Sequence, residues 1–300
     1  MPELPEVESV RASLEPYLVG NKILNVQVNK PKLVSGNGTK RVASQEKKSE
    51  FENELEGEVF KAVKRRAKNL IFEFESGKIL LVHLKMTGQM VYRDSADNVA
   101  FGGHPIKNSV GEDDLPNKHT HVVFELEEGD LYYNDTRMFG YLLYYPDFEL
   151  MDKEGHFTGL GYEPTEVDFT LENFKEAMRE RRGILKNLFL AQKVVVGLGN
   201  IYCDEVCFEA GVLPDRRVES LKDDELEALY EAIVRIIPAA IAAGGSSVAN
   251  YVLGDGSRGT FVEEHKVYMK GGEPCYVCGE QLQKEKIAGR TTVFCLNCQK

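Results

Sequence analysis

Residues 69–86 read NLIFEFESGKILLVHLKM, a pattern typical of two β-strands that fold back on each other. Apolar side chains fill most positions of both arms, and Ser76-Gly77 suits a tight turn because glycine tolerates a left-handed backbone. A second stretch, HVVFELEEGDLYYND at 121–135, repeats this arrangement around Glu128-Gly129. Both hairpins lie in a region of period-two patterning from about residue 22 to 145, which we expect to form an antiparallel β-sandwich.

The chain begins MPELPEVESVRASLEPYL (1–18), which predicts an amphipathic helix of about four turns. Proline is favoured at the first helical position, so we place the start at Pro5. Apolar residues then recur at steps of three and four, at Val7, Val10, Leu14 and Leu18. Pro2 and Glu3 are therefore expected to project beyond the helix.

The pattern changes to helical after about residue 150, and the fold class we predict is α+β. We expect a helix and β-sandwich domain over 1–150, a helical domain over 151–261, and, around two pairs of cysteines, a zinc ribbon over 262–300. Two polar stretches interrupt the strands and are expected to be surface insertions, 35–48 and 93–118.

Two C-x-x-C pairs near the C-terminus predict a structural zinc site. Their members are Cys275, Cys278, Cys295 and Cys298, and the pairs stand 16 residues apart. Four thiolates from two knuckles match the closed tetrahedral shell of Zn²⁺. A redox dithiol would need only one pair, so we predict one structural zinc ion.

The formal net charge of −11 argues at first against nucleic acid as a partner. The acidic residues, however, are concentrated at 46–58 and 219–231, at helical spacing, while compact basic clusters occur at 61–68 (KAVKRRAK) and 179–182 (RERR). Local charge decides phosphate binding, so the sequence remains compatible with DNA as a ligand.

No apolar run approaches the ~20 residues that a transmembrane helix needs, and the first residues lack the pattern of a signal peptide. We therefore expect a cytoplasmic protein. The stretch VVVGLGNIYCDE (194–205) does not complete a dinucleotide-binding G-x-G-x-x-G, but a glycine-rich turn before a helix can still offer N–H groups to a DNA phosphate.

Taken in order along nearly the whole chain, eight motifs resemble those of the formamidopyrimidine-DNA glycosylases, bacterial repair enzymes for oxidised purines. They are PELPEVE (2–8), RRAK (65–68), HLKMTG (83–88), NDTRMFG (134–140), LGYEP (160–164), GLGNIY (197–202), GEPCYVCG (272–279) and GRTTVFCLNCQ (289–299). The resemblance implies a bifunctional DNA glycosylase and lyase at abasic sites, in which the helical domain at 151–261 is a DNA-binding domain of the helix-two-turn-helix type. It also implies damaged double-stranded DNA as partner, no small-molecule cofactor, a monomer, and association with the nucleoid.

Four residues match the family's catalytic positions. After removal of Met1, the resemblance assigns the nucleophilic amine that attacks C1′ to Pro2, and the acid that helps to open the sugar to Glu3. Lys68 matches a lysine credited with proton transfer in β-elimination, and Arg290 matches an arginine assigned to δ-elimination and phosphate binding.

Further residues match DNA-binding positions. Met86, Arg137 and Phe139 correspond to residues that fill the gap left by an extruded nucleotide, with the arginine facing the orphaned base. Backbone contacts are implied for His83, His119, Arg181, Lys186 and Asn200. The loop at 242–261 matches a lid over the damaged base.

Four positions depart from the family pattern: Lys85, where glycine is usual, Thr136, where proline is common, Met138, where a second arginine is common, and Ala191, where aspartate is frequent. Because Pro2 and the cysteines are intact, we still expect activity. These departures bear on affinity and lesion preference.

Two other interpretations remain open. A related endonuclease VIII-type glycosylase would prefer oxidised pyrimidines, but PELPE, Arg137 and Phe139 favour the purine enzyme. A non-catalytic zinc-ribbon DNA-binding protein would explain the basic clusters and the cysteines, although it gives no reason for Pro2-Glu3.

Overall fold

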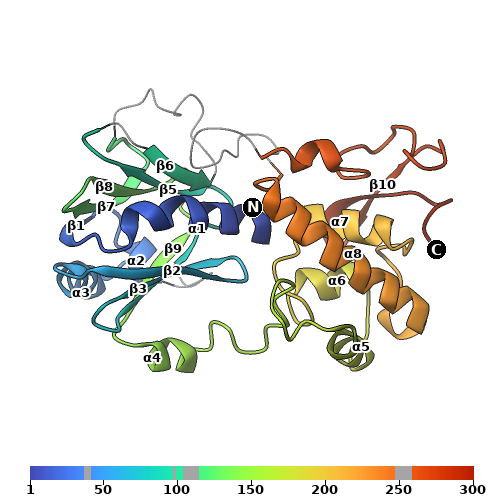
Figure 1. The fold of residues 1–300 in the computed structure, drawn as a ribbon, viewed down its shortest axis with the longest axis horizontal. Helices are drawn as coiled ribbons and strands as arrows, with labels where there is room; N and C mark the ends of the chain where they lie inside the picture. The colour runs from blue at the N-terminus through green and yellow to red at the C-terminus, as the bar shows by residue number, and fades with distance from the viewer. Residues whose placement is uncertain (37–41, 97–98, 104–114, 247–258) are drawn as a thin grey trace. The chain divides into compact units, whose positions relative to one another are not determined.

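The computed structural model describes residues 1–36, 42–96, 99–103, 115–246 and 259–300. The chain forms two compact units (Figure 1). The first comprises Met1–Thr158 with Gly244–Thr260, and the second comprises Gly159–Ala243 with Phe261–Lys300.

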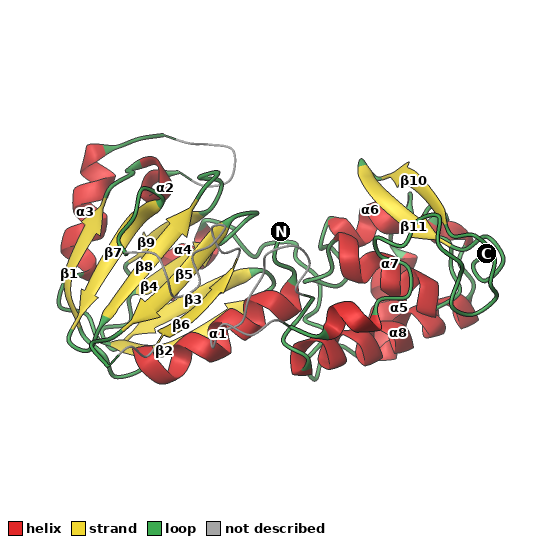
Figure 2. Cartoon of the chain, turned by 90° about the horizontal axis from the view of Figure 1, so that it is seen from above, coloured by secondary structure: helices red, strands yellow, loops and turns green. Residues whose placement is uncertain are grey.

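The first unit contains two antiparallel sheets, which confirms the predicted sandwich (Figure 2). The five-stranded sheet runs in the order β1 (Ile23–Val28), β7 (Thr120–Leu126), β8 (Asp130–Asp135), β5 (Gly88–Arg93), β6 (Val99–Gly103). The four-stranded sheet runs β2 (Phe60–Arg66), β3 (Asn69–Phe74), β4 (Ile79–His83), β9 (Tyr141–Tyr145). Apolar side chains of both sheets meet in one core, among them Val122, Leu131, Phe72 and Val82.

Three strands of the four-stranded sheet, β3, β4 and β9, are buried on both faces, which explains why they read as nearly continuous apolar runs. Phe72 and Leu80 face the sandwich core, while their neighbours Ile71 and Leu81 face a second cluster. That cluster is closed by Met151 of α4 (Phe148–Lys153), a short helix that the sequence pattern did not predict.

Helix α1 (Leu4–Leu18) begins at Leu4, so Pro5 is its second residue rather than its first. The predicted apolar positions Val7, Val10, Leu14 and Leu18 are each 1% exposed or less. The helix packs against β2 and β6 and joins the core of the sandwich.

Parts of the two expected insertions belong to the folded unit. Helix α3 (Gln45–Leu55), capped by the Ser44 side chain, buries Phe51 and Leu55, and α2 (Lys32–Ser35) precedes it. Strand β6 pairs along β5 within the second polar stretch. Composition alone missed these elements because only a few of their residues are apolar.

The second unit is helical, as predicted, and ends in a two-stranded hairpin. Its α-helices are α5 (Leu171–Arg179), α6 (Leu185–Leu190), α7 (Asn200–Glu209) and α8 (Asp223–Ala242), with short 3-10 turns at Val218–Ser220 and Phe261–Glu264. The hairpin consists of β10 (Gln283–Ile287) and β11 (Arg290–Phe294), and α7 packs against both α8 and β11. Among the described residues, no helix has the length and apolar character needed to span a membrane.

Candidate functional site

Glu6 holds the first residues of the chain outside α1. Its carboxylate accepts a hydrogen bond from the backbone N–H of Glu3 (2.8 Å) and one from that of Ser246 (2.7 Å). Glu3 therefore stays extended (φ −95°, ψ −170°), with its side chain 3% exposed, and Pro2 is also buried. The sequence interpretation missed Glu6, although it lies within the PELPEVE motif.

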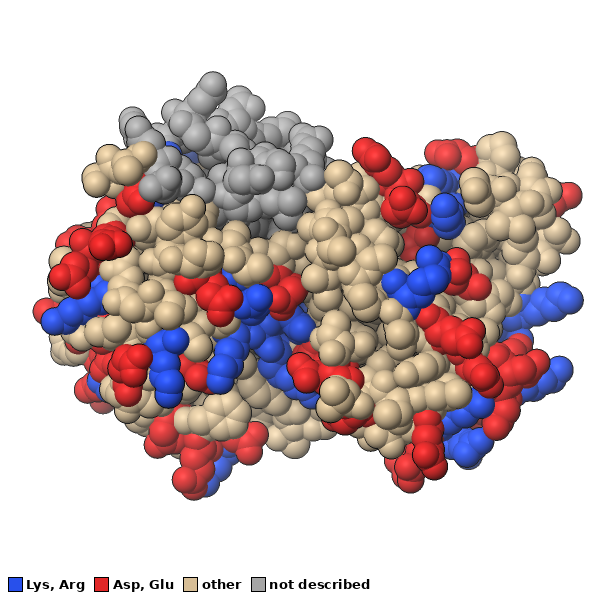
Figure 3. Space-filling view, in the orientation of Figure 1, with Lys and Arg blue, Asp and Glu red and all other residues tan. Residues whose placement is uncertain are grey.

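Lys68 lies in the turn between β2 and β3. The turn residue before it, Ala67, has a left-handed backbone (φ +52°), and its carbonyl accepts a hydrogen bond from Arg65 (3.0 Å). Arg65 also pairs with Glu8 of α1 (2.9 Å). The turn is thus fixed to the helix that carries Pro2 and Glu3, and Lys68 is only 7% exposed. On the face drawn in Figure 3, Lys and Arg side chains gather over β2, while acidic and basic side chains are mixed with uncharged ones over the other described parts.

His83 is held as a neutral ring at the end of β4. Burial lowers its pKa well below the usual range, and the charges of Lys85 and Lys68 lower it further. Its Nδ1 accepts the backbone N–H of Lys85 (3.0 Å), so the ring proton is on Nε2. His83 can therefore donate one hydrogen bond to a phosphate but brings no charge.

The three residues expected to fill the gap in DNA lie together on two neighbouring loops. The Arg137 guanidinium is 4.5 Å from the centre of the Phe139 ring, and its Nη1 is 3.1 Å from the sulfur of Met86. Met86 and Phe139 are each 41% exposed, and Arg137 is exposed too. The three side chains therefore form one group.

Asp135 connects these two loops. Its carboxylate accepts the Thr87 hydroxyl on one side and the backbone N–H groups of Arg137 (3.1 Å) and Gly140 (2.8 Å) on the other. The side chain is fully buried. The sequence interpretation assigned no role to Asp135 or Thr87, although both belong to quoted motifs.

Two of the family departures adopt left-handed backbone conformations in these loops. Lys85 has φ +52° and Met138 has φ +54°. Glycine adopts this conformation without strain, which explains why a glycine fits at position 85. The Lys85 ammonium lies over the Tyr141 ring, 5.5 Å from its centre.

The second unit presents polar atoms without partners at two predicted DNA contacts. Asn200 donates its amide N–H to the Thr291 carbonyl (2.9 Å), while its buried Oδ1 has no hydrogen-bond partner among the described residues. The same is true of the buried Nε of Arg181. Arg290 is exposed at the start of β11, directly after the Ala288-Gly289 turn.

The prediction that Lys186 contacts a DNA backbone is wrong in this structure. Its ammonium is fully buried, where it pairs with Asp204 and donates to the hydroxyl of Thr292 (2.7 Å). Burial raises the pKa of the Asp204 carboxyl, and the Lys186 charge opposes that shift. A lysine with its charge satisfied inside the protein cannot reach a phosphate on the surface.

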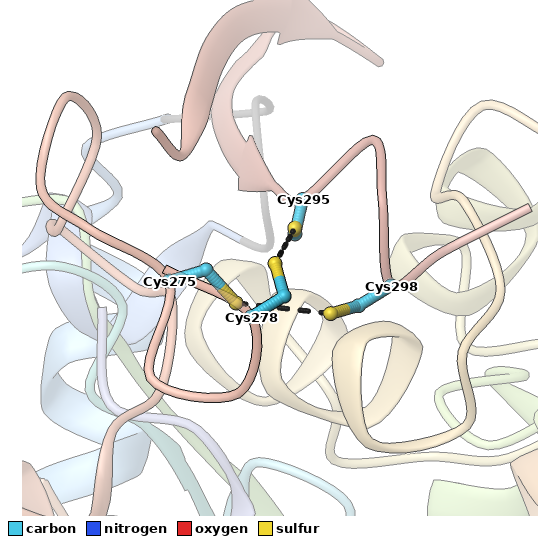
Figure 4. A group of neighbouring side chains, drawn as sticks. All are labelled: Cys275, Cys278, Cys295 and Cys298. Atoms are coloured by element: carbon cyan, nitrogen blue, oxygen red, sulfur yellow. Dashed lines mark hydrogen bonds between the residues drawn. The ribbon is translucent and has the colours of Figure 1, made fainter. Parts of the chain in front are cut away.

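The four cysteines of the ribbon come together (Figure 4). Their sulfur atoms all lie within 4.8 Å of one another, with Cys275–Cys298 at 3.8 Å and Cys278–Cys295 at 3.5 Å. Sulfurs around a tetrahedral Zn²⁺ with bonds of about 2.3 Å are separated by about 3.8 Å. The donor set therefore fits zinc.

Two further predictions concern His119 and the lid at 242–261. His119 is half-buried before β7, where its backbone N–H donates to Asn117 (2.9 Å) and its carbonyl accepts the N–H of Asp135 (3.0 Å). Most of the predicted lid at 242–261, namely 247–258, lies outside the described residues.

Comparisons with known proteins cover almost the whole chain. Three family models match: the formamidopyrimidine-DNA glycosylase N-terminal domain at residues 1–142, the H2TH domain of the same enzymes at 160–252, and a zinc finger found in FPG and IleRS at 272–300. A formamidopyrimidine-DNA glycosylase from Desulfitobacterium hafniense is 38% identical, with all of both chains covered.

Two solved structures from Lactococcus lactis resemble this one. Wild-type Fpg (MutM) in complex with DNA containing N7-benzyl-Fapy-dG is 33% identical, with a TM-score of 0.84 and all of both chains covered. Fpg in complex with DNA containing an abasic site is 34% identical, with a TM-score of 0.83 and 99% of both chains covered.

Proposed function

The chain belongs to the formamidopyrimidine-DNA glycosylase family, and we infer that it removes oxidised purines from duplex DNA and then cleaves the strand at the abasic site. Its four clustered cysteines form a zinc finger. Damaged DNA is its partner, as it is for the Lactococcus structures.

We propose that Pro2 is the nucleophile once Met1 has been removed. Its secondary amine attacks C1′ and gives up its proton to the base, which leaves with the bonding electron pair. Cleavage of the C1′–O4′ bond then yields an iminium, which withdraws electrons for elimination of the 3′-phosphate. Glu3 supplies the proton that opens the sugar. The observation that supports this most is the Glu3–Glu6 hydrogen bond, which keeps Pro2 and Glu3 out of the helix and in one fixed conformation.

We propose distinct roles for the cations. Lys68, at the turn anchored to α1, moves the proton in β-elimination, and Arg290 binds phosphate and assists δ-elimination. Arg137, Phe139 and Met86 occupy the gap left by the extruded nucleotide, while His83, His119, Arg181 and Asn200 contact the backbone. The Arg181 Nε, a donor without a hydrogen-bond partner among the described residues, supports that role for Arg181.

We further propose that the protein acts as a monomer in the cytoplasm, on nucleoid DNA, with domains at 1–150, 151–261 and 262–300. The endonuclease VIII-type alternative would require a preference for oxidised pyrimidines, which excision from a duplex carrying one oxidised pyrimidine would measure.

The test is incubation with a duplex carrying one 8-oxoguanine opposite cytosine, followed by borohydride. Wild-type protein should form a covalent adduct through its N-terminal nitrogen, and an intact-mass measurement should show Met1 absent. Pro2→Gly should bind the duplex but lose most excision, Glu3→Gln should bind without opening the sugar, and Lys68→Ala should still form the adduct. Adduct yields equal to wild type in Pro2→Gly and Glu3→Gln would mean that another amine attacks.

A further inference from the structure

Three consecutive residues of β11, directly after Arg290, are each held by a side chain from α6 or α7. The Thr291 carbonyl accepts the Asn200 amide (2.9 Å), the Thr292 hydroxyl accepts the Lys186 ammonium (2.7 Å), and the Val293 N–H donates to Asp204 (3.2 Å). Contacts at three successive positions fix the strand along its length as well as across it, because a shift of one residue would break all of them.

The centre of this arrangement is a buried ion pair. Lys186 and Asp204 are both fully buried, and each also bonds to β11, so neither charge is left with a single partner. Replacing a buried ion pair by apolar residues is often neutral for stability, whereas removing one partner leaves an uncompensated charge. Such a pair therefore contributes more to a defined geometry than to stability.

The next residue of α7 holds the other end of the ribbon. The Glu205 carboxylate accepts three backbone N–H groups where the chain enters the ribbon, from Lys266 (2.8 Å), Val267 (3.0 Å) and Tyr268 (2.7 Å). Neighbouring carboxylates on one helix thus bind the entry segment and the returning strand.

Zinc binding by itself would leave the tip of the β10–β11 hairpin far from the nearest zinc ligand. The nearest cysteine, Cys295, is five residues from Arg290, which corresponds to about 17 Å of extended strand. The contacts at Thr291, Thr292 and Val293 fill that interval, and two-stranded hairpins are only marginally stable without such support.

We propose that Lys186, Asp204 and Thr292, here called the register clamp, are positioning residues that set the place of Arg290 for the second elimination step. This inference rests on the role proposed above for Arg290. The clamp touches no substrate; it acts through β11.

The experiment measures how an abasic-site duplex divides between the β-elimination product and the β,δ-elimination product in a single turnover. This ratio is set within one bound complex, so it does not change with the amount of folded protein. Thr292→Val removes the hydroxyl and keeps the shape, and Thr291→Val makes the same change at the exposed neighbour. The double variant Lys186→Met with Asp204→Leu removes the charges while keeping an apolar filling.

Thr292→Val and the double variant should each shift the products toward β-elimination by about tenfold, the factor expected from one lost hydrogen bond to a charged group. Thr292→Ser should restore the wild-type ratio, and Thr291→Val should leave it unchanged. At duplex concentrations that saturate each variant, borohydride trapping should stay at the wild-type level, because Pro2 is untouched.

Arg290→Ala separates the two ways in which the idea can fail. If Arg290→Ala shifts the product ratio but the clamp variants do not, the clamp inference is wrong and the role of Arg290 stands. If Arg290→Ala leaves the ratio unchanged, the proposed role of Arg290 is wrong and the clamp inference falls with it.

Discussion

The side chain of Arg137 is oriented by two neighbours, because the Phe139 ring and the Met86 sulfur both contact it. A guanidinium held in this way loses less conformational freedom on binding, and its planar donors suit the acceptor edge of cytosine. Other charged side chains, such as Glu6 and Asp135, are buried and bind backbone N–H groups instead. Of these three charged residues, the exposed Arg137 is the one proposed to contact DNA, while the buried Glu6 and Asp135 hold the backbone.

Arg137→Ala should reduce the preference for 8-oxoguanine opposite cytosine over adenine by about tenfold, since a bidentate base contact discriminates by about 1–3 kcal/mol. Single-turnover excision from both duplexes measures the ratio. Phe139→Ala is the matched control and should slow both reactions alike. An unchanged ratio in Arg137→Ala would remove that residue from base reading.

His265 should make the stability of the protein fall on mild acidification. The residue is 3% exposed, and burial, helped by the charge of Lys270, lowers its pKa to about 4. The unfolded chain binds the proton near pH 6.5, so between about pH 6.5 and 4 acid favours unfolding. From pH 7.5 to 5.5 this costs about 1 kcal/mol.

Urea unfolding of wild type and His265→Gln at both pH values tests this, with zinc kept constant. Other titratable groups change the unfolding free energy of the two proteins equally between these pH values. The loss of unfolding free energy should be smaller in His265→Gln by about 1 kcal/mol, and equal losses would contradict the assignment.

The next scale is that of elements, where close approach of the backbone fixes the shape of the loops between strands. Gly140 ends the loop that carries Arg137 and Phe139, and its N–H binds Asp135. A Cβ at this position would stand 1.8 Å from the Tyr133 hydroxyl and 2.9 Å from the His83 carbonyl. Only glycine fits there without displacing the loop.

Gly140→Ala should therefore lower the unfolding free energy by about 1–3 kcal/mol and slow excision, because overpacking forces the backbone to move. Urea unfolding and single-turnover excision measure both effects. Tyr133→Phe removes the closest atom. Gly140→Ala should therefore lower the unfolding free energy less in a Tyr133→Phe background than in the wild-type protein. Wild-type behaviour of Gly140→Ala would show that the loop tolerates a side chain.

At the scale of the whole molecule, zinc and helix α7 both hold the ribbon in place. Val267, Leu282 and Val293 join Phe208 of α7 in a small apolar cluster that includes two of the cysteines. Such a core is too small to stabilise a ribbon by itself, so metal binding and folding are coupled.

Removing zinc should release Arg290 and abolish binding to damaged duplex, while the sandwich of the first unit stays folded. Metal analysis should find about one zinc per chain, and binding before chelation, after it and after zinc is restored measures the effect. Cys298→Ala should behave like the chelated protein. Normal binding without zinc would contradict this role.

Local patterns in the sequence determined the hairpins, helix α1 and the zinc site, because each depends on residues close together in the chain. The turn at Ser76-Gly77, the apolar face of α1 and the C-x-x-C pairs needed no distant partner. The family motifs added the reaction and the candidate residues.

Only the tertiary structure decided which charges face a ligand. Lys186 reads in the sequence as one more surface cation, but its partners Asp204 and Thr292 stand 18 and 106 positions away. Likewise, Arg137 meets Met86 across 51 positions, and Glu6 meets Ser246 across 240. Burial and pairing depend on such distant contacts, which the order of residues does not display and which form only when the chain packs.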